Sequence, residues 1–322
     1  MFAATFLART LAGLAALFVA SVAGAQAYPG KPVRIVVPFT AGGANDALAR
    51  IVAARLQASL NQPFVVENRA GVGGTIGLAS VAKSPADGYT LVIAEPGAYS
   101  INPSFMKNVG YDPVRDFVPV AALTELQLVI VANPATQIRS LKDLAGYGGG
   151  KSVAFGSAGV GTVQHLSMEL LKRTMKLEMT HVAYKGGSPA MTDLIGGHLP
   201  ILPVTVSTAL QPANAGQVVP IAALGRARTS TFPAVPTATE QGYPLNVAVW
   251  QGIFAPAGTP SAVVELLNNE IRRAITTPEV RKAITDLGME VTDMPREAFD
   301  RLVREDVKRW ADVIAEANVK PE

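Results

Sequence analysis

Short apolar runs alternate with stretches in which apolar residues recur every three or four positions along most of this chain. The short runs are typical of buried strands, and the longer spacing is typical of amphipathic helices. A helix capped by Asn45 is expected after the first run, and further helices are expected near 75–83, 141–145, 163–174 and 189–196. The alternation predicts an α/β fold with doubly wound sheets and right-handed crossovers. The expected strands are 33–37, 64–67, 90–94, 128–132, 152–157, 181–184, 201–206 and 218–224.

The pattern changes after residue 260, where three successive helices are expected at 261–276, 278–287 and 295–318. Pro260 and Pro278 stand near first turns, and Gly288 is expected to close the second helix. Helices at the end of a two-domain α/β chain commonly return to the first domain. We therefore expect a discontinuous domain 1, 28–130 plus 240–322, with domain 2, 131–239, inserted. Segments near 120–132 and 247–255 would connect the domains and form a hinge.

Composition excludes several classes of protein. The 322 residues are enough for two domains with a sizeable core. A net charge of +3, with 16% charged and 6% aromatic residues and no block of Lys or Arg, argues against nucleic-acid binding. The chain has no cysteine, and His165, His181 and His198 do not have metal-ligand spacing. We therefore expect no disulfide, no metal site and no cofactor.

Residues 1–27 have the pattern of a signal peptide. Arg9 supplies the positive charge, residues 11–24 form an apolar stretch too short to span a bilayer, and Ala25-Gln26-Ala27 fits a cleavage site. We therefore expect export to a periplasm, with a mature chain that starts near Tyr28. An uncleaved anchor is the alternative, and the short apolar stretch disfavours it.

Three glycine-rich loops follow expected strands or open expected helices, at 38–46, 68–77 and 156–165. In open α/β sheets, ligands bind outside the carboxyl ends of the strands. Glycines let backbone N–H groups approach a ligand there, and a helix N-terminus favours an anion. The loops therefore predict anion capture by main-chain donors. A plain tight turn is the alternative for each loop, and it carries most weight for 68–77.

Nucleotide-binding motifs do not fit. The dinucleotide pattern requires glycine where Ile76 and Gln164 stand, and the phosphate-loop pattern fails at Ala145. A Ser157 nucleophile with His165 and Asp193 is a remote alternative, because a nucleophile elbow requires glycine at position 155, where Phe155 stands.

The motifs together resemble a known family. The chain is similar to the Bug-type periplasmic receptors, the substrate-binding receptors of tripartite tricarboxylate transporters. The resemblance implies two domains of the type II periplasmic-binding-protein class around an interdomain cleft. It also implies a non-enzymatic receptor that delivers a small carboxylate to a permease of two integral subunits, and we expect the receptor to be a monomer. A sensory receptor read by a signalling kinase stays open as an alternative. The segments that carry the resemblance are 28–50, 65–77, 84–91, 101–105, 156–171, 181–199, 232–244 and 250–260.

The resemblance also implies where a ligand binds. Two facing loops would hold its carboxylate through backbone amides and bridging water, and the segment 184–193 would form the far wall. The candidate ligand-binding residues are Phe39, Thr40, Ala41, Gly42, Gly43, Asn45, Asp46, Glu95, Ala98, Ser157, Ala158, Gly159, Gly161, Thr162, His165, Tyr184, Lys185, Ala190 and Asp193.

The chain departs from the usual family pattern in two places. Many members carry a small residue or Pro followed by Thr where Ala44-Asn45 stand, and small hydroxyl residues or sometimes His in the loop where this chain has Glu95-Pro96-Gly97-Ala98-Tyr99. A carboxylate beside a carboxylate-binding cleft would repel a dianion unless it pairs with a cation or points away. We therefore hypothesise that the ligand carries an amine, amide or heterocycle besides its carboxylate.

Overall fold

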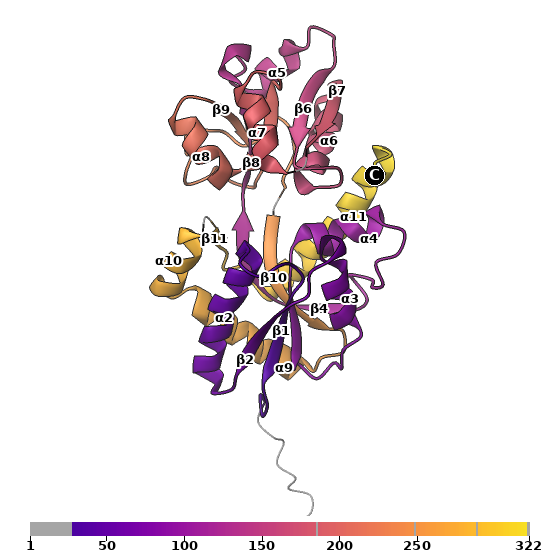
Figure 1. The fold of residues 1–322 in the computed structure, drawn as a ribbon, viewed down its shortest axis with the longest axis vertical. Coiled ribbons are helices and arrows are strands. Elements are labelled where there is room, and N and C mark those ends of the chain that lie inside the picture. Colours follow the sequence, from indigo (N-terminus) through magenta and orange to yellow (C-terminus); the bar gives the residue numbers. More distant parts are fainter. Residues whose placement is uncertain (1–27, 185, 248, 288, 321–322) are drawn as a thin grey trace, which may run out of the picture.

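The computed structural model describes residues 28–184, 186–247, 249–287 and 289–320. Two α/β lobes stand one above the other, and each holds one sheet (Figure 1). The expected leader, the candidate Lys185 and the expected helix end at Gly288 lie outside the described residues.

The first lobe contains a six-stranded sheet in the order β11-β4-β10-β3-β1-β2. β1 pairs in parallel with β2 and β3, whereas β10 runs antiparallel to β3 and β4. The strands are β1 (Val33–Val37), β2 (Phe64–Asn68), β3 (Thr90–Ala94), β4 (Phe117–Leu126), β10 (Val249–Pro256) and β11 (Glu290–Val291). The helices are α2 (Ala44–Leu60), α3 (Thr75–Ala82), α4 (Asn102–Phe105), α9 (Ser261–Ile275), α10 (Pro278–Asp286) and α11 (Arg296–Glu316), with short turns η1 (Val72–Gly74) and η2 (Gly97–Ile101).

The second lobe contains a five-stranded sheet in the order β7-β6-β8-β5-β9. β6 pairs in parallel with β7 and β8, and β5 runs antiparallel to β8 and β9. The strands are β5 (Leu128–Ala132), β6 (Val153–Ser157), β7 (Met179–Ala183), β8 (Ile201–Thr205) and β9 (Val219–Ala223). The helices are α5 (Leu141–Tyr147), α6 (Val163–Met175), α7 (Gly187–Ile195) and α8 (Val206–Asn214), with the turn η3 (Pro134–Thr136).

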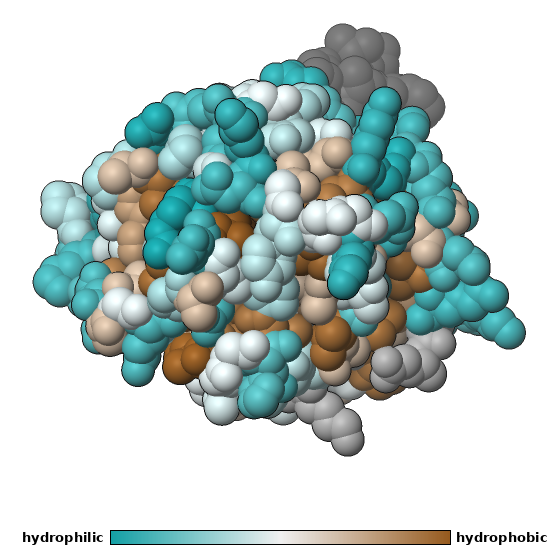
Figure 2. Space-filling model, turned by 90° about the horizontal axis from the view of Figure 1, so that it is seen from above, coloured by the Kyte–Doolittle hydropathy of each residue, from teal (hydrophilic) through white to brown (hydrophobic). Residues whose placement is uncertain are grey.

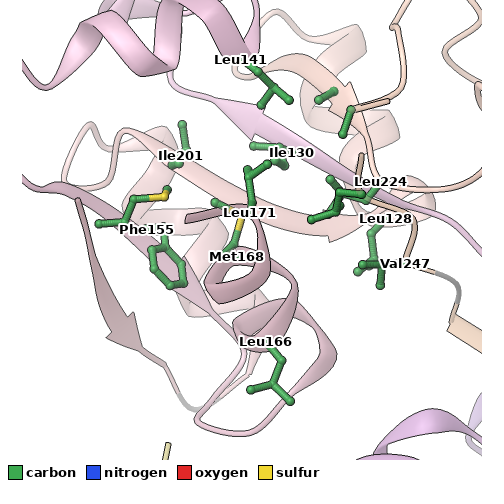
Figure 3. Close-up of a cluster of buried hydrophobic side chains, with 14 of the residues drawn as sticks. Leu128, Ile130, Leu141, Phe155, Leu166, Met168, Leu171, Ile201, Leu224 and Val247 are labelled. Atoms are coloured by element: carbon green, nitrogen blue, oxygen red, sulfur yellow. The ribbon is translucent and has the colours of Figure 1, made fainter. Parts of the chain in front are cut away.

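Both sheets have strands that are buried along their whole length. Every residue of β3 and of β5 is buried, which explains why these strands are uninterrupted apolar runs. In the second lobe, Leu166 and Met168 of α6 belong to the same core as Phe155 of β6 (Figure 3). The end of this lobe farthest from the first lobe is covered mainly by hydrophilic side chains (Figure 2).

The chain passes between the lobes at Gln127, which separates β4 from β5. It returns between β9 and β10, and β10 then pairs antiparallel with β4 over its whole length. The two crossing strands therefore form one paired ribbon, in which Val249 lies opposite Leu126.

Helix α11 also contacts both lobes. Phe299 and Leu302 pack in a core cluster of the first lobe, whereas Trp310 and Val313 belong to the core of the second. The end of α11 approaches α6 in Figure 1, where Glu316 pairs with Arg173. The helix therefore ties the lobes together beside the crossing strands.

Some local expectations from the sequence are wrong. Gly43 is the N-cap of α2, and Asn45 stands inside the first turn, where its side chain makes no capping bond. Helix α8 was not expected, because Val206 continues the apolar run and Pro212 lies within the helix. The expected α/β class with one sheet in each lobe is confirmed, and each sheet is mixed because the crossing strands run antiparallel to their neighbours.

Candidate ligand-binding site

The loops after β1 and β3 lie on the edge of the first sheet that faces the second lobe. Ala94, the last residue of β3, pairs with Gly252 near the start of β10. β10 starts at Val249, opposite the end of β4 where the chain crosses. Because β1 is parallel to β3, its carboxyl end also lies at this edge.

The same reasoning places three loops of the second lobe. Leu128, the first residue of β5 after the crossing, pairs with Thr205 at the end of β8. β6 and β7 run in the same direction as β8, so Ser157 and Ala183 end at the same edge. The strand ends of the two sheets therefore face each other across the crossing, the position where open α/β sheets bind ligands.

Asp46 holds the loop before α2. Its carboxylate is buried and accepts hydrogen bonds from the N–H of Gly42 (2.9 Å), from Nε and Nη2 of Arg50 (3.0 Å each) and from Nδ2 of Asn68 (3.0 Å). The Arg50 hydrogen bonds, with those of Gly42 and Asn68, lower the pKa of Asp46 to about 2. The carboxylate therefore maintains the loop conformation, and the Gly42 N–H is used inside the loop.

The rest of this loop is open. Thr40, Ala41 and Gly43 are exposed, and Phe39 is partly buried in a core cluster with Ala98. Among the described residues, the N–H groups of Ala41 and Gly43 have no protein acceptor. Together with the first turn of α2, they present donors to the space between the lobes.

A chain of side-chain hydrogen bonds connects the crossing strands to this loop. Thr124 donates to Oε1 of Gln251 (2.6 Å), Nε2 of Gln251 donates to Oδ1 of Asn45, and Nδ2 of Asn45 donates to Glu95 (3.1 Å). Thr124, Gln251 and Asn45 are buried, and Glu95 is partly buried. Burial raises the pKa of Glu95, against the opposing effect of the Asn45 hydrogen bond.

In the second lobe, the loop from Ser157 to Thr162 is held by neutral groups. The N–H of Gly159 donates to Oγ of Ser157 (3.1 Å), and the N–H of Gly161 donates to Nδ1 of His165 (3.1 Å). Thr162 is the N-cap of α6 and accepts from the N–H of His165 (3.3 Å). The N–H groups of Gly159 and Gly161, expected to face a ligand, are therefore used inside the loop in this conformation.

Two histidines lie under this loop. The rings of His165 and His181 stack with their centroids 3.7 Å apart, although the residues are far apart in sequence. Burial lowers the pKa of His165 to about 3 and that of His181 to about 4. Both rings are therefore neutral near neutral pH.

The geometry contradicts the remote hydrolase alternative. Oγ of Ser157 bonds His181 Nε2 (2.7 Å), whereas Nδ1 of His165 accepts from Gly161. Asp193 accepts a hydrogen bond from the hydroxyl of Tyr184 (2.7 Å). The three residues thus bond other partners and form no catalytic relay.

The far wall is formed by the end of β7 and by α7. Burial, followed by the hydrogen bond to Asp193, raises the pKa of Tyr184 to about 12. The carbonyl of Ala158 accepts from the N–H of Gly186 (3.1 Å), which ties this wall to the loop after β6. Ala190 is buried in α7.

Sequence reasoning missed three residues at the facing edges. Thr205 is the N-cap of α8 at the end of β8, and Thr124 and Gln251 form the buried part of the hydrogen-bond chain. A glutamine inside the apolar run 249–256 is the one signal that could have indicated Gln251.

A cavity of about 280 Å³ lies at the crossing. It is lined by residues from both lobes, and no predicted ligand-binding residue lines it. The lining residues are Glu125, Leu126, Gln127, Thr205, Val206, Ser207, Leu210, Ser230, Thr231, Thr285, Met289 and Glu290.

Within the described part of the chain, no cluster of His, Cys, Asp or Glu side chains is arranged to bind a metal ion. Over the same residues, no helix combines the length and apolar character needed to cross a membrane.

Two α/β lobes, a pair of crossing strands and opposed glycine loops define a periplasmic binding protein. The chain belongs to the tripartite tricarboxylate transporter receptor family, whose model matches residues 48–319.

Individual relatives agree with this assignment. The chain is 35% identical to the protein BugT of Bordetella pertussis, with 94% of each chain covered. The solved structure of the periplasmic binding protein BugD is 33% identical, with a TM-score of 0.69 over 92% of this chain and 100% of that one. MatC from Rhodopseudomonas palustris, solved with bound malate, is also 33% identical, with a TM-score of 0.69 over 89% of this chain and 100% of that one.

Proposed function

We propose that this receptor captures a small carboxylate-bearing metabolite between its lobes and releases it unchanged to a membrane permease of two integral subunits. The observation that carries the proposal is the opposition of two helix N-termini, those of α2 and α6, at facing sheet edges. Helix N-termini attract anions through their unpaired N–H groups and the helix dipole. Malate bound to MatC supports a carboxylate as the ligand.

Capture of the ligand carboxylate requires only main-chain and neutral groups. A hydrogen bond from the backbone to a charged acceptor contributes about 1.5–3 kcal/mol when well formed. Several such bonds in a closed, dry cleft are enough for micromolar affinity, about −8 kcal/mol. Ser157, His165 and Asp193 are each bonded to other partners, so the proposal includes no reaction of the ligand. The mature receptor, exported by its leader, acts as a monomer in the periplasm.

Gly43→Val tests the proposal. Gly43 has φ −81°, and the nearest atom to an added Cβ is the Thr40 carbonyl oxygen at 3.7 Å, so the fold accepts a side chain there. A valine would cover the α2 N-terminus and remove at least one hydrogen bond to the ligand. We expect affinity for the best carboxylate found by calorimetry, starting with malate, to fall at least about tenfold.

Gly146→Val is the matched control, because an added Cβ there meets nothing within 4 Å and the residue lies in α5. The control keeps wild-type affinity. Equal affinity of Gly43→Val and the wild type would contradict the proposal.

A further inference from the structure

Glu95 is a carboxylate at the candidate site without a cationic partner. It directly follows β3, at the sheet edge that faces the second lobe, and is partly buried. Its Oε2 accepts the Asn45 amide at 3.1 Å, and no cation of the described residues pairs with it. Asn45 itself lies in the first turn of α2, whose N-terminus is proposed to hold the ligand carboxylate. A carboxyl group without a cation therefore stands beside an anion site, and a cation brought by the ligand would favour its ionised form.

The hydrogen-bond chain maintains this arrangement. The Thr124 hydroxyl donates to Oε1 of Gln251, which leaves Nε2 of Gln251 to donate to Oδ1 of Asn45. The oxygen of Asn45 is thereby used, and its NH₂ group must face Glu95. Because Thr124 and Gln251 are buried in the crossing strands, Asn45 cannot turn without leaving a buried polar atom unpaired. Asn45 thus orients one oxygen of Glu95, while Oε1 has no donor among the described residues.

Such a carboxylate discriminates between ligands. A second carboxylate on the ligand would be repelled, because nearby like charges disfavour each other in a partly desolvated site. A protonated amine would supply the missing cation and a hydrogen-bond donor for Oε1.

We propose that Glu95 selects ligands that carry a protonated amine beside the carboxylate, so that this receptor prefers amino carboxylates to the same acids without the amine. This inference rests on the proposed function and names the substrate class of the same site. The ligand carboxylate binds the α2 N-terminus, and its ammonium group binds Oε1 of Glu95. Glu95 is a specificity-determining residue, and Asn45 is its positioning residue.

Calorimetric titrations at neutral pH with matched acid pairs test the inference. The pairs are L-aspartate with succinate, L-glutamate with glutarate, and 4-aminobutyrate with butyrate. In the wild-type protein the tightest ligand of the panel is an amino acid, which binds at least about tenfold tighter than its partner acid. In Glu95→Gln the ratio of the two affinities, amino acid over partner acid, falls at least about tenfold. The fall comes from weaker binding of the amino acid, tighter binding of the plain acid, or both. The glutamine side-chain oxygen still accepts the Asn45 hydrogen bond, so the fold is kept.

Glu125→Gln is the matched control. Glu125 is also a partly buried carboxyl group of the first lobe whose pKa is raised by burial. Its neighbour Thr124 points to the opposite face of β4, toward Gln251. This variant keeps the wild-type ratio, whereas an equal change in both variants would indicate a general charge effect and overturn the inference.

The outcomes separate this inference from the proposed function. Tight binding of succinate or glutarate with no change in Glu95→Gln overturns the inference and leaves the carboxylate receptor intact. If no acid of the panel binds the wild-type protein, the inference falls. If a wider set of carboxylates also fails to bind, the proposed function falls with it.

Discussion

In the first lobe, the loop between β1 and α2 is held by charged groups: the carboxylate of Asp46 binds the Arg50 guanidinium and the Gly42 N–H. In the second lobe, the loop between β6 and α6 is held by neutral groups: Ser157, Thr162 and two histidines of lowered pKa. Both loops join a strand to a helix N-terminus and face the same space. They differ in what keeps them in place.

This difference indicates that the two lobes have different roles in ligand binding. The first lobe carries Asp46, Arg50 and Glu95 near the site, so it discriminates ligands by charge. The loop between β6 and α6 of the second lobe offers hydroxyl groups, neutral rings and backbone, which can accept ligands of different charge, and the Asp193 carboxylate of the far wall is bonded to Tyr184. We infer that ligand choice is made on the first lobe and that the second lobe completes the enclosure.

The largest expected effect comes from removing the charge that holds the first loop. In Asp46→Ala, the buried oxygens that accept from Gly42, Arg50 and Asn68 are lost. We expect the free energy of unfolding to fall by about 3 kcal/mol. Ligand affinity should fall as well, because Gly42 and the α2 N-terminus lose their fixed conformation. Urea denaturation and calorimetry measure the two effects.

Asp286→Ala is the control for this prediction. Asp286 pairs with Lys282 at 2.7 Å on exposed α10, and such surface pairs contribute little. If Asp46→Ala had the same free energy of unfolding as this control, the Asp46 carboxylate would not stabilise the loop between β1 and α2.

The next effect concerns backbone conformation in the second loop. Gly161 has φ +75°, and an added Cβ would lie 2.9 Å from the Phe105 ring of the other lobe. Gly161→Ala should therefore lower the free energy of unfolding by about 1–2 kcal/mol. Gly43→Ala, at an ordinary φ, should leave it nearly unchanged. Equal unfolding midpoints for the two variants in urea would show that the second loop does not require glycine.

Local patterns predicted most of the elements but little of the side-chain network. β3 and β5 were expected at their observed bounds, because an uninterrupted apolar run with polar ends has few other interpretations. The two glycine loops were expected at strand ends for the same local reason. Which lobe each strand joins, and the antiparallel direction of β10, depend on pairing between distant segments.

The network was missed because its partners are far apart in sequence. Asn45 and Gln251 are separated by 206 positions, and nothing near either residue indicates the other. The stacking of His165 on His181 follows from packing α6 against the β6–β7 pair, so histidine spacing could not predict it. The acceptors for the N–H groups of Gly42 and Gly161 are near in sequence, since Asp46 and His165 each lie four positions further along the chain. These bonds were missed for another reason, because a loop sequence does not show toward which backbone group such a side chain turns.

The smallest effect is the pH dependence of the neutral loop. Burial holds the pKa of His181 at about 4, below its ordinary value of 6.5, so between these values the unfolded chain binds more protons than the folded one. The contribution of His181 to stability is therefore complete above about pH 6.5 and is lost as the pH falls toward about 4. His181→Gln cannot titrate, and its side chain can still bond Ser157. The free energy of unfolding of the wild type, relative to that of this variant, should thus fall between about pH 7 and about pH 4.5. We expect a fall of only about 1 kcal/mol, because the ring is half-buried and solvent screens its charge.

Urea denaturation of both proteins at each pH measures this difference in the free energy of unfolding. The contribution of the carboxyl groups cancels in the difference, because these groups titrate equally in both proteins. His198→Gln is the control for replacing a histidine of the same lobe outside the second loop, because His198 is exposed in the turn after α7. A constant difference for His181→Gln would mean that the second loop tolerates a charged ring. Charge discrimination would then no longer distinguish the first lobe from the second, and a ligand cation or anion could be selected on either side of the cleft.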